Sequence, residues 1–307
     1  MNGEKGIEST EMLVIIGIVL VLGAVVAGYL MEKGNLLVLL QPAELVIIAG
    51  AALGTLLIAN PLPVVIKVIK GIIGVLSGSK YSDKFYLENL KMMNELFQHA
   101  RKNGMAKLEE DVEKPNESAL FKRYPKLLKD HHMLDFLCDT LRTSLSGVVP
   151  PFELDQVMEL DLEVHRHEAS VPVAALTTVA DALPGLGIVA AVLGVVITMG
   201  SLGGPPEEIG HKVAAALVGT FLGIFLCYGF LAPLAGAMTK SNDAEAHFYG
   251  CLRVALVAFA KGLPPILAVE FARRSIPADL RPSFQKMEAA CKGVALAAVP
   301  AGAEDGK

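Results

Sequence analysis

Long apolar stretches separated by polar segments dominate the pattern of this chain. Four of them lie at residues 12–31, about 45–66, about 184–202 and about 213–238. A helix needs about 20 apolar residues to cross a hydrocarbon core. Since lipid offers no partner to an unpaired backbone group, we expect each stretch to be a transmembrane helix.

The connections between these stretches predict two helical hairpins. About a dozen residues join the first pair, and the turn sequence GGPPEE at 203–208 joins the second. Between the hairpins, residues 65–76 place lysines off an apolar face, as in a helix lying along a membrane surface. Further amphipathic helices are expected at 81–103, where Gly104 would end the helix, at 120–147 and at 153–182, and strand-like alternation is absent.

Lysines near the membrane ends set the expected orientation, because cytoplasmic loops carry an excess of Lys and Arg. Such lysines follow the second and fourth spans and are scarce in the hairpin loops: Lys67, Lys70, Lys80, Lys84 and Lys240 against Lys33 and Lys212. Both termini are therefore predicted to be cytoplasmic. The predicted fold is an all-α integral membrane protein, with four transmembrane helices in two hairpins and a helical cytoplasmic domain between helices 2 and 3.

These assignments divide the chain into five regions. They are an N-terminal cytoplasmic segment, a first hairpin, a helical domain with a membrane-surface helix, a second hairpin and a cytoplasmic tail: residues 1–11, 12–66, 67–182, 183–239 and 240–307. A cleaved signal peptide is the alternative for the first span, because Lys5 precedes it. The apolar run is too long for that, and its entry is acidic, with Glu4, Glu8 and Glu11.

Composition and motifs exclude several classes of protein. The 307 residues are 53% hydrophobic with a net charge of -5, and their mean hydropathy of +0.50 is too high for an ordinary soluble domain. A basic stripe with interleaved aromatic residues is absent, so no nucleic-acid binding is predicted. Catalytic and phosphate-binding motifs are also absent, and His165 and His167 point to different sides of a helix. We expect no enzyme, no cofactor and no metal.

The third and fourth spans contain no charged side chain. A transporter that carries its own ion usually keeps a charged group inside a span. Here the polar groups at depth are the hydroxyls of Thr198, Thr220 and Tyr228, and Glu44 lies at the mouth of the second span. An ion passing along these helices would need a titrating group from another chain.

Small residues and prolines mark the same two spans. The small residues allow close helix packing, either within one subunit or around a partner helix: Gly187, Ala190, Ala191, Gly194, Gly219 and Gly223. Pro184 and Pro233 either start the third span and end the fourth, or kink them near their cytoplasmic side. A hinge there could couple movement in the membrane to the soluble domain.

Five motifs together resemble one family. They are QPAELVIIAGAALG at 41–54, LPGLGIVAAVLGVV at 183–196, LVGTFLGIFLCYGFLAPLA at 217–235, PPILAVEFARR at 264–274 and RPSF at 281–284. In this order they resemble the MotA family of flagellar motor stator subunits, within the wider group of PomA, ExbB and TolQ. The resemblance covers residues 12–285.

The resemblance implies a function, an ion and a partner. It implies a proton channel in the bacterial inner membrane that couples proton flow to torque, built as a homopentamer around two single-span MotB-type subunits whose aspartate carries the ion. The pore-lining threonine carries over to Thr220, and Tyr228 is assigned to the same predicted ion pathway. Sodium-driven relatives have a second threonine where this chain has Ala191, and an alanine offers no oxygen to a cation, which favours H+ over Na+.

The resemblance also implies contact with the rotor protein FliG through opposite charges. These carry over to Arg101 and Glu109, which are eight residues apart. Judged by the residues alone, Arg101 and Glu109 are two members of a charged region. They are then no better candidates for a rotor contact than Lys107 or Glu110. The family prolines carry over to Pro184 and Pro233, as elements of conformational coupling.

Three alternative functions make different demands on the sequence. An ExbB- or TolQ-like energiser of outer-membrane processes would have three spans and would lack the leading QPAEL hairpin. A self-contained secondary transporter would need its own membrane carboxylate or a pair of broken helices. A membrane enzyme would need a catalytic cluster.

Overall fold

The computed structural model describes residues 5–200 and 203–293, and the regular elements in these ranges are all helices. The described residues divide into two compact units. Residues 5–79 and 167–242 form one, which we call the membrane unit. Residues 80–166 and 243–293 form the other, which we call the polar unit. The predicted all-α architecture is confirmed.

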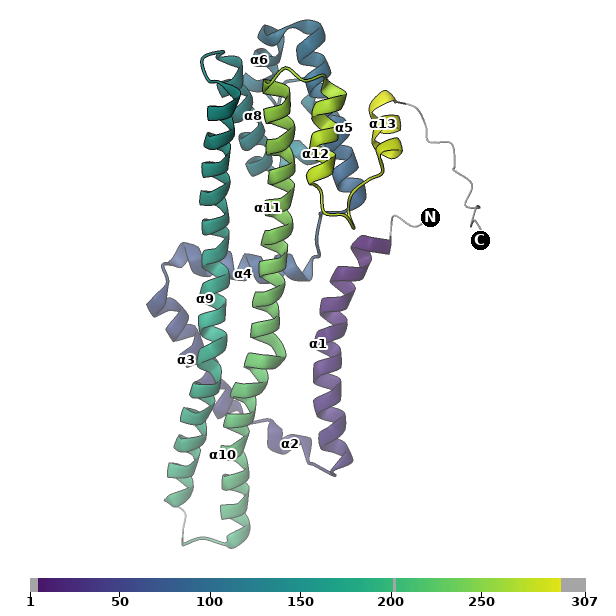
Figure 1. Cartoon of the computed structure of the whole chain (residues 1–307). Coiled ribbons are helices and arrows are strands. Elements are labelled where there is room, and N and C mark those ends of the chain that lie inside the picture. The colour runs from purple at the N-terminus through teal and green to yellow at the C-terminus, as the bar shows by residue number, and fades with distance from the viewer. Residues whose placement is uncertain (1–4, 201–202, 294–307) are drawn as a thin grey trace, which may run out of the picture. The chain divides into compact units, whose positions relative to one another are not determined.

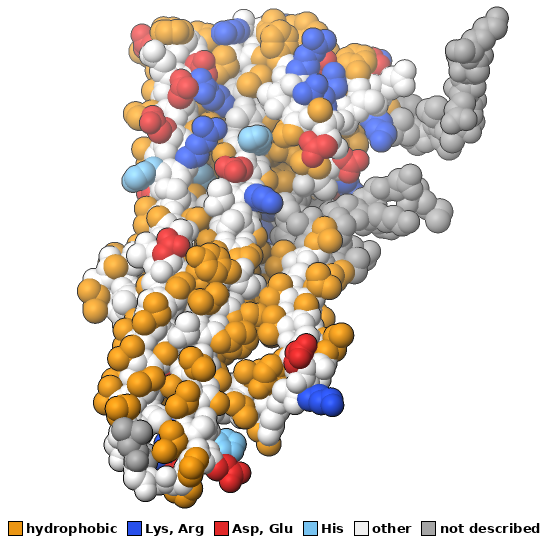
Figure 2. Space-filling view, turned by 60° about the horizontal axis from the view of Figure 1, so that its bottom comes forward, with side chains coloured by type: hydrophobic (Ala, Val, Ile, Leu, Met, Phe, Trp, Pro, Cys, Tyr) orange, Lys and Arg blue, Asp and Glu red, His pale blue; other side chains and the backbone are white. Residues whose placement is uncertain are grey.

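The membrane unit holds helices long and apolar enough to span a membrane. They are α1 (Lys5–Met31), α3 (Pro42–Ala59), the second part of α9 (Pro151–Met199) and α10 (Pro206–Leu226), with the short α2 (Leu36–Leu39) between the first two (Figure 1). Large apolar side chains stay exposed on these helices, as expected of side chains that face lipid (Figure 2): Leu20, Val46, Ile58, Ile197 and Leu217. The fourth span continues through a π-helical turn (Cys227–Leu231) into α11 (Ala232–Ala260).

The second span is shorter than expected. It ends at Ala59 rather than at about Ile66, because Asn60 adopts an extended conformation and the proline at 61 begins the next element. The helix that was expected to lie along the membrane surface corresponds to α4 (Leu62–Leu76), which starts before the expected residue 65. It buries Val65 and Val68, while Ile69 stays exposed.

The polar unit is a bundle of helices around one hydrophobic core. It contains α5 (Asp83–Asn103), α6 (Met105–Glu113), a 3-10 turn (Phe121–Arg123), α7 (Pro125–Lys129), α8 (His131–Leu145), the first part of α9, the end of α11, α12 (Pro265–Ser275) and α13 (Phe284–Lys292). Phe97 of α5 stacks on Phe259 of α11 with ring centroids 4.3 Å apart. Side chains of Ser82 and Asp130 cap α5 and α8 by accepting hydrogen bonds from backbone N–H groups.

The region that the sequence indicated as a C-terminal tail is folded as far as it is described. The helix that follows the fourth span runs on to Ala260, and α12 and α13 both pack against α5. Their apolar faces explain this packing, because Ala268, Val269 and Met287 are fully buried. Residues 294–307 of the predicted tail lie outside the described residues, as do the first four residues of the N-terminal segment.

Candidate functional site

The membrane unit brings α9 and α10 into direct backbone contact. A methyl group placed on Gly187 of α9 would lie 2.8 Å from the carbonyl oxygen of Gly219. One placed on Gly223 of α10 would lie 2.5 Å from the carbonyl oxygen of Leu183. Side chains do not fit at such distances, so both positions require glycine. These small residues therefore pack two helices of the same chain, and they need no partner helix to account for them.

Glu44 lies in the first turn of α3, at the mouth of the second span, where the sequence placed it. The residue is only 7% exposed, and its position at a helix start does not by itself predict this burial. Its carboxyl group contacts α9 and α10. Methyl groups on Gly219 and Gly194 would lie 2.6 Å from its Oε2 and 3.5 Å from its Oε1. The cause is tertiary, because neighbouring helices cover this start of α3.

The predicted ion-pathway residues lie on the same pair of helices. Ala191 of α9 and Thr220 of α10 are both half-buried. A methyl group on Gly219, which precedes Thr220, would lie 3.1 Å from the backbone nitrogen of Ala191. The structure thus brings these two positions to one level of the helix pair. Tyr228 lies in the π-helical turn, about two helical turns after Thr220, and is 70% exposed.

Pro184 and Pro233 both lie inside continuous helices. Pro184 is within α9, and Pro233 is the second residue of α11, directly after the π-helical turn. In that turn the N–H of Ala232 donates to the carbonyl oxygen of Cys227. A proline removes a helix hydrogen bond and a π-helical turn shifts the helix register, so both weaken the helix locally. The helix neither begins at Pro184 nor ends at Pro233.

Sequence reasoning missed parts of this arrangement. Pro172 also lies inside α9, ahead of the apolar stretch that identifies the third span. The π-helical turn has no signature in the residue pattern. The burial of Glu44 had one available signal, since it is the single acid between Gln41 and the end of an otherwise apolar run at Ala59.

Arg101 and Glu109 lie in the polar unit on either side of a sharp turn. Arg101 is in the last turn of α5 and Glu109 is in α6, with Gly104 between the helices at φ 85°. Both side chains are exposed, and neither forms an ion pair with another residue in the described ranges. Lys107 and Glu110, in contrast, pair with each other at 2.5 Å, and this hydrogen bond lowers the pKa of Glu110.

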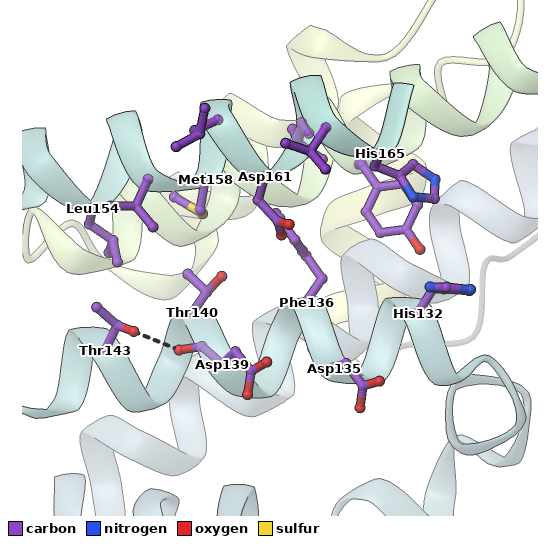
Figure 3. Close-up of a pocket in the computed structure, with 15 residues that line it drawn as sticks. His132, Asp135, Phe136, Asp139, Thr140, Thr143, Leu154, Met158, Asp161 and His165 are labelled. Carbon is purple, nitrogen blue, oxygen red and sulfur yellow. Dashed lines mark hydrogen bonds between the residues drawn. The ribbon is translucent and has the colours of Figure 1, made fainter. Parts of the chain in front are cut away.

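The polar unit also contains a cavity of about 540 Å³ between α8 and α9. Asp161 and His165 reach from α9 toward α8, where His132 lies (Figure 3). The two imidazole rings are 5.8 Å apart. Across the part of the chain that the structure describes, no three His, Cys, Asp or Glu side chains are grouped so that they could hold a metal ion.

Two family models match this chain, one in each half of the sequence. Residues 15–104 match the family described as Motility protein A N-terminal, and residues 128–249 match the MotA/TolQ/ExbB proton channel family. Motility protein A of Escherichia coli is 42% identical over 277 residues, which cover 90% of this chain and 94% of that protein. Chemotaxis protein LafT of Vibrio parahaemolyticus is 38% identical, covering 89% and 96%.

Solved structures agree in fold. A chain of the flagellar MotAB stator complex from Bacillus subtilis has a TM-score of 0.69 at 23% identity and covers 86% of this chain and 95% of its own. A chain of C. jejuni MotAB has a TM-score of 0.71 at 20% identity, covering 88% and 97%. At these identities the likeness concerns the fold. The identity to the Escherichia coli protein over nine-tenths of the sequence decides the family: this chain belongs to the MotA family of motility proteins.

Proposed function

We propose that this chain is the ion-conducting stator subunit of a bacterial flagellar motor. With a MotB-type partner it forms a proton channel that couples proton flow to torque on the rotor. One observation carries the proposal: a chain of the MotA family places no Asp, Glu, Lys or Arg in residues 183–199 and 213–226, which form its closely packed helix pair. Because neither helix of the pair carries a titrating side chain of its own, the proposal assigns the ion-carrying carboxylate to a partner. Relatives matched over most of the chain are motility and chemotaxis proteins, which favours a flagellar motor over an ExbB- or TolQ-like energiser.

The transported ion is H+. Ala191 and Thr220 lie at one level of the helix pair, and only the threonine offers a side-chain oxygen. Coordinating a dehydrated Na+ requires several oxygen ligands. The alanine therefore supports H+ over Na+.

The partners extend beyond the MotB-type subunit. Five copies of this chain surround two partner subunits in the inner membrane, with the N- and C-termini in the cytoplasm. FliG is contacted by Arg101 and Glu109. Both are exposed and form no ion pair within the described chain, which leaves them available, unlike Lys107 and Glu110.

Coupling runs through the two prolines. Thr220 is 13 positions before Pro233, which is about 20 Å along one helix at about 1.5 Å per residue. Protonation of a partner carboxylate near Thr220 changes the local charge. The π-helical turn and Pro233 weaken the fourth span on the α11 side of Thr220. A shift of the helix between two arrangements is therefore transmitted through this weakened segment.

The test is proton flux into liposomes that contain this chain alone, its single-span partner alone, or the purified complex. Flux is expected only for the complex, with H+ and not Na+ as the driving ion. Equal flux from this chain alone would contradict the need for a partner. Flux that depends on a sodium gradient would contradict the assignment of the ion.

A further inference from the structure

Glu44 is a buried acid that the proposed mechanism does not yet use. It is 7% exposed, and its Oε2 is buried with no hydrogen-bond partner among the described residues. The backbone N–H groups in the first turn of α3 do not explain the burial of this acid, because the end of its side chain contacts α9 and α10 instead. An acid that only capped its own helix would turn back toward those N–H groups.

The surroundings of this carboxyl group are small and apolar. Gly194 of α9 and Gly219 of α10 lie beside it, and Ala216 and Ala190 lie beside these two glycines. Gly219 leaves the room that the carboxyl group fills, because a methyl group there would lie 2.6 Å from Oε2, whereas one on Gly194 would lie in ordinary contact at 3.5 Å from Oε1. On α3 itself the next inward residue is Ile48, which is fully buried.

No counter-charge faces Glu44 from the described parts of α3, α9 or α10. The nearest cation along α10 is Lys212, seven positions before Gly219, which is about 10 Å along the helix. Lys212 also forms an ion pair with Glu208 at 2.9 Å. An ionised carboxylate without a partner is costly in such surroundings, whereas a neutral carboxylic acid is not.

The position of this acid is as informative as its burial. A methyl group on Gly219 would lie close to both the carboxyl group of Glu44 and the backbone nitrogen of Ala191, and Thr220 follows Gly219 directly. Glu44 therefore lies at the level of the two predicted ion-pathway residues. A group there can exchange a proton with an acid on a partner helix that packs at the same level.

We propose that Glu44 is a proton-binding site within this subunit, and that it takes up and releases one proton for each ion that passes Thr220. In the uptake step one carboxylate oxygen accepts a proton that arrives through water. In the release step the O–H bond breaks and the proton moves to the partner's carboxylate, so that Glu44 returns to its starting charge. The release step rests on the proposed function, and the proton-binding property does not.

The first test uses the wild-type complex in native membranes, so it requires no variant to fold. Dicyclohexylcarbodiimide reacts with protonated carboxyl groups in apolar surroundings, and peptide mass spectrometry locates the modified residue. Glu44 is expected to be modified, with a yield that falls as the pH rises and that added Na+ does not change. An unmodified Glu44 under conditions that label the partner's acid would overturn the proposal, and protection by Na+ would assign the site to a metal cation.

The second test measures proton flux through the Glu44→Gln complex, with Glu32→Gln as a matched control at an exposed acid of the same hairpin. Glu44→Gln is expected to lower the flux at least tenfold while the partner still co-purifies, and Glu44→Asp should restore part of it. Flux equal to that of the wild type in Glu44→Gln overturns the proposal. A wild-type complex that conducts no protons contradicts the proposed function instead, and the labelling result still decides whether Glu44 binds a proton.

Discussion

Arg253 of α11 donates a hydrogen bond from Nε to Oδ1 of Asp155 in α9, at 2.5 Å. A second nitrogen of the same guanidinium group reaches Glu159 at 3.3 Å. These contacts join two helices of the polar unit that are 98 positions apart in the sequence. We expect Arg253→Ala to lower the free energy of unfolding by about 1–2 kcal/mol, because charge-assisted hydrogen bonds are stronger than neutral ones.

Thermal melting of the purified chain in detergent, followed by circular dichroism, measures this effect. Arg101→Ala is the matched control, since Arg101 is an exposed arginine without an ion pair in the described chain. Equal melting temperatures for the two variants would mean that the Arg253 contacts contribute nothing to stability.

Charge reversal at Arg101 or Glu109 is expected to impair swimming without affecting assembly. Exposed charge pairs are worth only about 0–1 kcal/mol each, so neutralisation should weaken motility and reversal should weaken it more. Motility in soft agar and co-purification of the partner are the measurements. Lys107→Glu together with Glu110→Lys preserves an internal pair and serves as the control. Normal swimming by Arg101→Glu and Glu109→Lys, with loss in the control, would show that the contacts are assigned to the wrong residues.

Replacing Pro184 or Pro233 by Leu is expected to abolish rotation while folding, insertion and partner binding persist. Leucine restores the helix hydrogen bond that proline removes, and so stiffens the segment that is proposed to bend. Tethered-cell rotation and pull-down of the partner are measured for each variant. Pro206→Leu is the control, because a proline in the first position of α10 interrupts no helix bond. Normal rotation in both test variants rejects the hinge, and loss of the partner makes the prolines structural.

Glu270 of α12 is expected to make stability depend on pH in the acid range. Hydrogen bonds from Arg273, and then from Arg274, lower its pKa from 4.5 to about 2 against the opposing effect of burial. Because the folded-state pKa is below the unfolded value, its stabilisation is complete above 4.5 and is lost as the pH falls toward 2.

Glu270→Gln should therefore lower the melting temperature at neutral pH and flatten its decline in that acid window. Lys261→Gln, at an exposed position in the same unit, is the control for a simple change of charge. An unchanged decline between pH 4.5 and 2 would place the acid sensitivity in other carboxyl groups.

The spans were predictable because long apolar runs have few alternatives in a folded chain. Their ends are less predictable. Val64, Val65 and Ile66 are as apolar as the helix before them and so indicate a second span that reaches Ile66. The break at Asn60 and Pro61 decides the end instead. Local backbone chemistry outweighed hydrophobicity at this point.

The candidate site was predictable only in part. The residue pattern indicated that Ala191 and Thr220 belong to two adjacent spans, but not that Gly219 brings them to one level. The sequence indicates that Glu44 lies at the start of the second span, but it does not show which helices cover that helix start. Burial of this kind depends on contacts between residues about 150 to 175 positions apart, which no periodicity encodes.

The π-helical turn at Cys227–Leu231 acts on its helix as a dislocation acts in a crystal. It inserts one extra residue into the repeat, so the side chains on its two sides are out of phase by about 100° relative to an unbroken α-helix. Pro233 follows two residues later and has no N–H to donate, so a further helix hydrogen bond is absent close to this turn. The directions in which α10 and α11 present their side chains are therefore related by this one turn and not by the repeat of a continuous α-helix.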